Sequence, residues 1–144
     1  MKKGSGPDIE FDHVGVAVAG IDEAYPFWQA LGWAKDAHPE VVEGQKVKVA
    51  MLPLQNQSQV ELLEPTSQES PVQKFMDKRG PGIHHICFRV KNIVQTLEKL
   101  KKSGVKLIND KPVPGAHNRL VAFVHPASTG GILVELSQVK GEGA

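Results

Sequence analysis

The sequence predicts an α+β fold in which two β-α-β-β-β modules pair into a curved, mixed sheet that encloses a cleft, with the helices outside. The first observation is an internal repeat, because residues 13–18 (HVGVAV) return as residues 85–90 (HICFRV). The second is that each copy later contains the tripeptide Val-Glu-Leu, at residues 60–62 and again at residues 134–136. The third is that apolar residues alternate in the opening stretch of each copy, which is typical of strands with one buried face.

The first module is predicted over residues 10–66 and opens with a strand over residues 11–18, whose valines share one face. The helix that follows is predicted over residues 23–31. Asp22 is its expected N-cap, and Pro26 falls in its first turn, where a missing N–H costs little. The later strands of this module are predicted over residues 33–37, 46–53 and 59–64.

The second module is predicted over residues 83–138 and repeats this order. A strand over residues 83–90 leads into a helix over residues 93–103, with Gly104 as its C-cap. The linker between the modules, residues 67–82, is rich in turn residues. The remaining elements predicted here are a short helix over residues 71–78 and strands over residues 106–109, 119–125 and 132–137.

Length and composition describe one globular domain over residues 1–144. A chain of 144 residues buries roughly 68–70% of its unfolded surface, and 40% hydrophobic with 23% charged residues are ordinary values. A net charge of +1 gives no reason to expect a nucleic acid partner, and no apolar run predicts a membrane span. We expect a cytoplasmic protein, with residues 1–7 as a flexible lead and the single cysteine, Cys87, as an inert core residue.

Four side chains from the two copies are predicted to share the cleft face of the sheet. Because the aliphatic residues of each opening strand face the helices, His13 and His85 are left on the cleft side. By the same alternation Glu61 and Glu135 face the cleft, since their aliphatic neighbours are packed. Two imidazoles and two carboxylates suit Zn, Co, Ni, Mn or Fe rather than Ca, and they leave two positions of an octahedral shell open for a substrate.

The other histidines are weaker candidates for this site. His84 competes with His85 as a ligand, but it falls in phase with the helix-facing residues of its strand. His117, in a predicted loop, is a candidate for contact with a ligand. His125 is expected to be structural, and His38 is expected to lie in a surface turn.

Four segments of the two repeats carry a resemblance to a known family, namely residues 12–18 (DHVGVAV), 60–65 (VELLEP), 82–87 (GIHHIC) and 131–136 (GILVEL). They resemble segments of the vicinal oxygen chelate, or glyoxalase, superfamily. Within it, HHIC and GGILVEL are similar to segments of the methylmalonyl-CoA epimerase branch. The resemblance implies a homodimer, an acyl-CoA substrate and a divalent metal ion such as Co, Mn, Ni, Zn or Mg. The metal ligands that it implies are His13, Glu61, His85 and Glu135.

The epimerase branch implies a reaction that exchanges the (2R) and (2S) forms of methylmalonyl-CoA through a metal-stabilised enolate. Inversion needs one base on each face of the α-carbon, one to remove the proton and one to return it. Glu135 is implied as one base as well as a ligand. Glu43 and Lys48 are the candidates for the second base, and Lys48 is alternatively a partner for the substrate carboxylate.

Three other functions of the same fold are weighed against this one. A lactoylglutathione lyase uses a similar ligand set and a similar proton transfer. A ring-cleaving dioxygenase needs two histidines and one carboxylate around its iron, rather than two of each. A non-catalytic protein that sequesters a small antibiotic needs no metal ligands, so the presence of all four argues against it.

Overall fold

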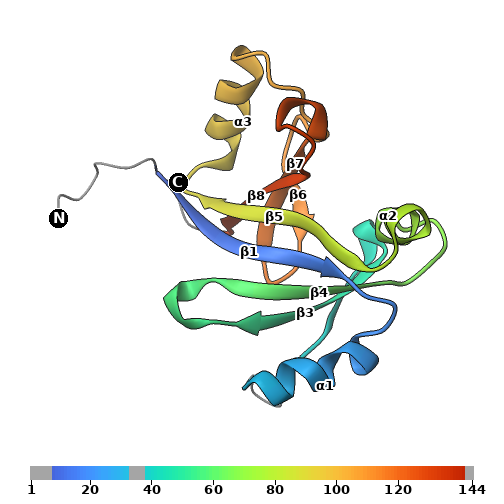
Figure 1. Cartoon of the computed structure of the whole chain (residues 1–144). Coiled ribbons are helices and arrows are strands. Elements are labelled where there is room, and N and C mark those ends of the chain that lie inside the picture. Colours follow the sequence, from blue (N-terminus) through green and yellow to red (C-terminus); the bar gives the residue numbers. More distant parts are fainter. Residues whose placement is uncertain (1–7, 33–37, 142–144) are drawn as a thin grey trace. The chain divides into compact units, whose positions relative to one another are not determined.

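The computed structural model describes residues 8–32 and 38–141 (Figure 1). The elements follow the predicted order, β-α-β-β-β twice with one helix between the repeats. The first repeat comprises β1 (Ile9–Ala17), α1 (Ile21–Leu31), β2 (Glu40–Val42), the single-turn helix η1 (Glu43–Gln45), β3 (Val47–Pro53), η2 (Gln55–Gln57) and β4 (Gln59–Pro65). The helix α2 (Pro71–Arg79) precedes the second repeat, which comprises β5 (Gly82–Val90), α3 (Ile93–Lys102), β6 (Val113–Gly115), β7 (Arg119–Val124), η3 (Pro126–Ser128) and β8 (Val134–Val139).

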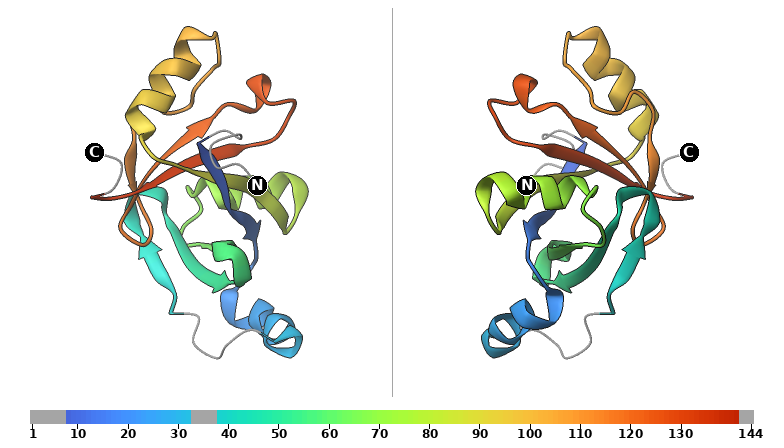
Figure 2. Two further views of the ribbon diagram at one scale, coloured as in Figure 1. Left: turned by 90° about the vertical axis from the view of Figure 1, so that its left-hand side faces the viewer. Right: turned by 90° about the vertical axis from the view of Figure 1, so that its right-hand side faces the viewer.

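The described residues contribute eight strands to one mixed sheet, in the order β2-β3-β4-β1-β5-β8-β7-β6. In the first repeat β1 runs parallel to β4, while β3 is antiparallel to both β2 and β4. The second repeat uses the same pattern, because β5 is parallel to β8 and β7 is antiparallel to it. The α+β class and the mixed sheet are therefore confirmed (Figure 2). The enclosed cleft stays a prediction.

The described residues divide into two compact units that nearly coincide with the repeats. Residues 13–32, 38–85 and 115–117 form what we call the first-repeat unit, and residues 8–12, 86–114 and 118–141 form the second-repeat unit. The strands β1 and β5 each contribute to both units, because the divisions fall after Asp12 and after His85. The single domain built from two modules stays a prediction.

The first-repeat unit buries apolar side chains on both faces of its strands. On one face Leu62 of β4 packs with Ile21 of α1. On the other face Leu63 of β4 packs with Val72 of α2. Because successive side chains of a strand point to opposite faces, Glu61 lies on the same face as Leu63, the face that α2 partly covers.

The second-repeat unit packs its apolar side chains under α3, where Ile93 is completely buried. The register of β5 with β8 aligns Cys87 with Glu135 and Arg89 with Ser137. The intervening residues of both strands pack into the cluster beneath α3. Alternation therefore places these four residues on the face opposite to α3.

Both repeats begin their long helix with the same tertiary hydrogen bond. The backbone N–H of Ile21 donates to the Glu64 carboxylate at 2.9 Å, and the N–H of Ile93 donates to the Gln138 side-chain oxygen at 2.8 Å. Each acceptor lies near the end of the last strand of its own repeat. A strand side chain thus satisfies an N–H group that has no partner within the helix.

The prediction for α1 was wrong at its start. The helix begins at Ile21, earlier than predicted, so its N-cap is Gly20 and Asp22 lies in the first turn. Pro26 consequently lies inside the helix rather than in its first turn. The side chain of Glu64, distant in sequence, accepts the N–H of Ile21 at this start.

Two predictions for the second repeat were also wrong. Residues 106–109 form only an isolated bridge with β7, and β6 follows at Val113–Gly115 instead. The Asn109 side chain accepts the N–H of Phe123 at 2.8 Å, so a side chain replaces a bond that a strand ladder would make. The C-cap of α3 is Ser103, and Gly104 follows it in a left-handed conformation with a φ of 84°.

Some predictions fall outside the described residues, namely the strand over residues 33–37 and the lead over residues 1–7. Within residues 8–32 and 38–141, no helix has the length and apolar character that crossing a membrane requires.

A buried charge network lies on the face of the second-repeat unit opposite α3. Asp12 is completely buried and forms ion pairs with Arg89 and, at 2.8 Å, with Arg119. Arg119 also donates to the Ser137 hydroxyl at 2.8 Å, and Arg89 lies 3.2 Å from the Glu10 carboxylate. Burial alone would lower the pKa of Arg89, but hydrogen bonds and attraction from Glu10 and Asp12 raise it. One carboxylate therefore links residues of β1, β5 and β7.

We predict that Asp12→Asn lowers the free energy of unfolding by about 3 kcal/mol, because two guanidinium groups lose their buried counter-charge. Urea unfolding of the metal-free protein measures this change. The matched control is Asp8→Asn, which removes an exposed carboxylate that pairs with Lys91 at 3.6 Å. It should change the free energy of unfolding by less than about 0.5 kcal/mol. Equal effects of the two substitutions would show that the network contributes little to stability.

Candidate functional site

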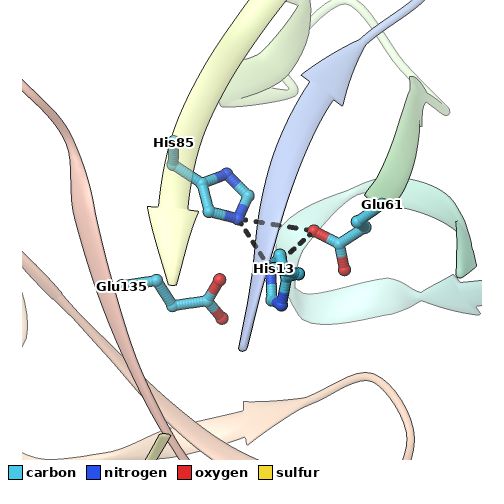
Figure 3. A group of neighbouring side chains, drawn as sticks. All are labelled: His13, Glu61, His85 and Glu135. Atoms are coloured by element: carbon cyan, nitrogen blue, oxygen red, sulfur yellow. Dashed lines mark hydrogen bonds and ion pairs between the residues drawn. The ribbon is translucent and has the colours of Figure 1, made fainter. Parts of the chain in front are cut away.

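Three polar side chains converge within the first-repeat unit (Figure 3). His13 comes from β1, Glu61 from β4 and His85 from β5. The Nε2 atoms of His13 and His85 lie 3.1 Å apart. The Oε1 atom of Glu61 lies 3.2 Å from His13 Nε2 and 3.4 Å from His85 Nε2. One carboxylate oxygen and two imidazole nitrogens therefore meet at one point.

This cluster is shielded from water, since His13 and His85 are each 3% exposed and Glu61 is 6% exposed. Burial by itself would raise the pKa of Glu61. Hydrogen bonds and attraction from the two imidazoles outweigh burial and hold that pKa well below its ordinary value. Two facing imidazole nitrogens repel each other as bare acceptors, so a proton or a cation between them would stabilise the arrangement.

The register of β1 with β4 explains how the cluster assembles. Gly15 is paired with Glu61, and His13, two residues before Gly15, shares their face of the sheet. A Cβ atom added at Gly15 would lie only 2.2 Å from Cε1 of His85. The His85 ring therefore lies directly against the Gly15 backbone. Sequence reasoning missed Gly15, although a glycine inside a predicted strand is a known sign of close approach.

The donor set of these three residues fits a divalent transition-metal ion. Each residue offers one ligand atom, and these atoms lie within 4.8 Å of one another. Ligand atoms about 2.1 Å from one ion are about 3.0 Å apart at right angles and about 3.4 Å apart in a tetrahedron. The separations of 3.1–3.4 Å between the three atoms fall in this range. The structure thus brings together His13, Glu61 and His85.

Glu135, also drawn in Figure 3, belongs to the second-repeat unit. Its side chain is 7% exposed, and its backbone is aligned with Cys87 of β5 and Phe123 of β7. It holds the same place in the second Val-Glu-Leu segment that Glu61 holds in the first. Its roles as fourth ligand and as base stay predictions.

The two candidates for the second base lie in different places. Lys48 is aligned with Glu64 of β4, and its ammonium group lies 3.8 Å from the Glu64 carboxylate. Because Glu61 is three residues before Glu64 on β4, alternation places Lys48 on the opposite face from Glu61, the face that α1 covers. The structure therefore does not bring Lys48 to the cluster. Glu43 begins η1, directly after β2, and its side chain is exposed.

Two further histidines have defined surroundings. The sequence predicted that His84 faces away from the site. In the structure its Nδ1 nevertheless lies 2.9 Å from Nδ1 of His85. Its ring contacts Phe75 of α2 edge-on. His117 lies near Glu40 of β2, which accepts the His117 backbone N–H at 3.1 Å and lies 3.4 Å from its ring. Contact of His117 with a ligand stays a prediction.

The sequence matches a known group of proteins. A family model described as the Glyoxalase/Bleomycin resistance protein/Dioxygenase superfamily matches residues 12–123. This chain belongs to that superfamily. The resemblance inferred from the repeated segments is thereby confirmed.

Similar proteins within the superfamily include several named epimerases. The chain is 35% identical over 130 residues to the ethylmalonyl-CoA/methylmalonyl-CoA epimerase of Cereibacter sphaeroides, covering 89% of this chain and 96% of that protein. It is 39% identical over 131 residues to the uncharacterised Bacillus subtilis protein YqjC, covering 91% of this chain and 93% of YqjC. A methylmalonyl-CoA epimerase solved with methylmalonyl-CoA and NH4+ superposes with a TM-score of 0.86, at 32% identity, over 94% of this chain and 98% of the other.

We predict that a divalent ion binds at the histidine–glutamate cluster and stabilises the fold. At a free ion concentration 100 times the dissociation constant, binding adds about 2.7 kcal/mol to the free energy of unfolding. Thermal unfolding with Co(II), with and without a chelator, measures the effect. His13→Ala should abolish the stabilisation, and the control His38→Ala, at an exposed position, should retain it. Equal stabilisation of both variants would place the bound ion elsewhere.

Proposed function

We propose that the protein is a methylmalonyl-CoA epimerase, which interconverts the (2R) and (2S) forms of its substrate by moving the proton at C2. The observation that carries the proposal is the buried cluster of His13, Glu61 and His85. It occurs in a chain that is similar over nearly its whole length to enzymes named for this reaction. The Cereibacter relative is named for two substrates, so ethylmalonyl-CoA is the related acyl-CoA to compare.

We propose that His13, Glu61 and His85 hold one divalent ion and that Glu135 is the fourth ligand. When bound, such an ion supplies Lewis-acid stabilisation of the negative charge that develops on the thioester oxygen. The burial of these three residues of the first-repeat unit keeps water from competing for this position, which strengthens electrostatic interactions there. Glu61 contributes a fixed negative charge, because its neighbours hold its pKa low.

Inversion at C2 needs two groups that exchange a proton with opposite faces of the carbon. We propose Glu135 for one face, since its carboxylate is buried and repeat-equivalent to a member of the cluster. For the other face we propose Glu43 rather than Lys48. The ammonium group of Lys48 pairs with Glu64 on the α1 side of the sheet, away from Glu61. We further expect a homodimer, by resemblance, and a cytoplasmic location, from the single cysteine.

The first test is exchange of the C2 proton of methylmalonyl-CoA for deuterium in heavy water. We predict that Co(II)-loaded protein catalyses exchange with inversion at C2, and that chelator-treated protein is inactive until metal is restored. Mass spectrometry measures the exchange, and coupling to a stereospecific mutase measures the inversion. Absence of exchange with each divalent metal tried would refute the proposal. Hemithioacetal substrates would then test a lactoylglutathione lyase, and binding of small antibiotics would test a non-catalytic role.

We predict that Glu135→Gln and Glu43→Gln each lower kcat for epimerisation by about 10² to 10⁴, because each removes one proton-transfer group. In each variant, deuterium exchange and inversion should be affected to different extents. A variant that lacks one base should still exchange deuterium into one of the two stereoisomers faster than it inverts that isomer. The control is Glu98→Gln, at an exposed position on α3, which should retain full activity. Full activity of Glu43→Gln would exclude Glu43 as the second base.

A further inference from the structure

The orientation of His85 depends on two neighbours that are not themselves predicted ligands. We propose that Gly15 and His84 form a socket that holds the His85 imidazole with Nε2 towards His13 and Glu61. The two are then positioning residues for metal binding. This inference rests on the proposed metal-dependent function and concerns how one ligand is held ready for the ion.

The first wall of the socket is the backbone of Gly15. A Cβ atom at this position would lie 2.2 Å from Cε1, 2.5 Å from Nδ1 and 2.7 Å from Nε2 of His85. Carbon atoms in contact prefer separations of about 3.5–4.0 Å. The His85 ring therefore occupies the space that the side chain of any other residue at position 15 would need. His85 is itself 3% exposed, so the ring has little room in which to withdraw.

Neither the strand conformation nor the repeat requires a glycine at this position. Gly15 lies inside β1 and is not among the glycines with a positive φ. A glycine inside a strand weakens it, because it adds backbone entropy and offers no side chain to pack. At the equivalent place in the second repeat the residue is Cys87. The specific use of glycine at position 15 is the close approach of the His85 ring.

The second wall is the side chain of His84. Its Nδ1 lies 2.9 Å from Nδ1 of His85, within hydrogen-bonding distance, so one ring donates to the other. This contact engages the ring nitrogen of His85 that points away from the cluster. Nε2 of His85 is left facing His13 Nε2 at 3.1 Å and Glu61 Oε1 at 3.4 Å. Histidines that bind metals in proteins usually have their second ring nitrogen hydrogen-bonded in this way, which sets both tautomer and orientation.

The His84 ring is in turn supported by α2. Its centroid lies 4.9 Å from that of Phe75, with the planes at 79°. The guanidinium of Arg79 lies over the Phe75 ring, 5.8 Å from its centroid. Val72 anchors the same helix in the core of the first-repeat unit. The linker helix between the repeats thereby supports the ring that contacts His85.

The steric half of the proposal is tested by a double-mutant cycle between positions 15 and 85 in metal-free protein. We expect Gly15→Ala to lower Tm by about 5 °C in the wild-type background, because the added methyl group overlaps the imidazole. In a His85→Ala background the same substitution should change Tm by less than about 1 °C, since the ring is gone. The matched control is Gly44→Ala, because a Cβ there meets no atom within 4 Å. Equal effects of Gly15→Ala in both backgrounds would overturn this half.

The hydrogen-bonding half is tested with two substitutions of His84. His84→Phe keeps an aromatic ring against Phe75 but removes Nδ1. His84→Asn places an oxygen or nitrogen close to the position of Nδ1. We expect His84→Phe to weaken Co(II) binding about tenfold and to change the visible spectrum of the bound Co(II), and His84→Asn to restore both. Chelator competition measures the affinity without substrate.

The outcomes separate this inference from the proposed function. Tight Co(II) binding by wild type without epimerisation would refute the function and leave the socket to be judged by its own variants. Wild-type affinity in both Gly15→Ala and His84→Phe would refute the socket even in an active enzyme. No binding of Co(II) by the wild type would refute the metal-positioning role, and the Tm cycle would then report only the packing of His85 against Gly15.

Discussion

The buried contact among His13, Glu61 and His85 is the interaction on which the proposed chemistry depends. Three polar groups with little access to water are tolerable only when each satisfies another, because an unpaired buried polar group costs several kcal/mol. The carboxylate between two imidazoles meets this requirement and remains charged. The same arrangement presents one oxygen and two nitrogens at separations that suit a single cation. The constraint that makes the cluster stable thus also produces a donor set that suits a metal ion.

Equivalent positions in the two repeats have the same role in some cases and different roles in others. Both helices that follow an opening strand receive a hydrogen bond from a side chain near the end of the last strand of the repeat, Glu64 in one copy and Gln138 in the other. The opening strands themselves have diverged, with Gly15 in the first where Cys87 stands in the second. In the first-repeat unit the small residue admits the His85 ring. The repeat is therefore symmetric in backbone and asymmetric in the packing that prepares its site.

Several charged side chains close in sequence to the site form ion pairs that stabilise the fold instead. Lys48 and Glu64 pair with each other on the α1 side of the first-repeat unit, where Glu64 also accepts the first N–H of the helix. Asp12 is adjacent to His13 in sequence, yet its carboxylate forms ion pairs with Arg89 and Arg119. Residues adjacent in sequence thus take different tasks because neighbouring strand residues contact different surroundings. Asp12 therefore serves the fold, although it is adjacent to His13 in sequence.

The sequence alone determined the repeated order of elements and the common face assigned to His13, Glu61 and His85. Both follow from periodicity, since alternation along a strand and recurrence of a module are local properties. The tertiary structure decided what local patterns do not contain. It placed Lys48 on the far face of the sheet, started α1 at Ile21 with its N–H bonded to Glu64, and set His84 and Gly15 against His85. Each of these depends on strand register or on contact between distant segments, and such contacts are fixed only when the strands pair and the helices pack.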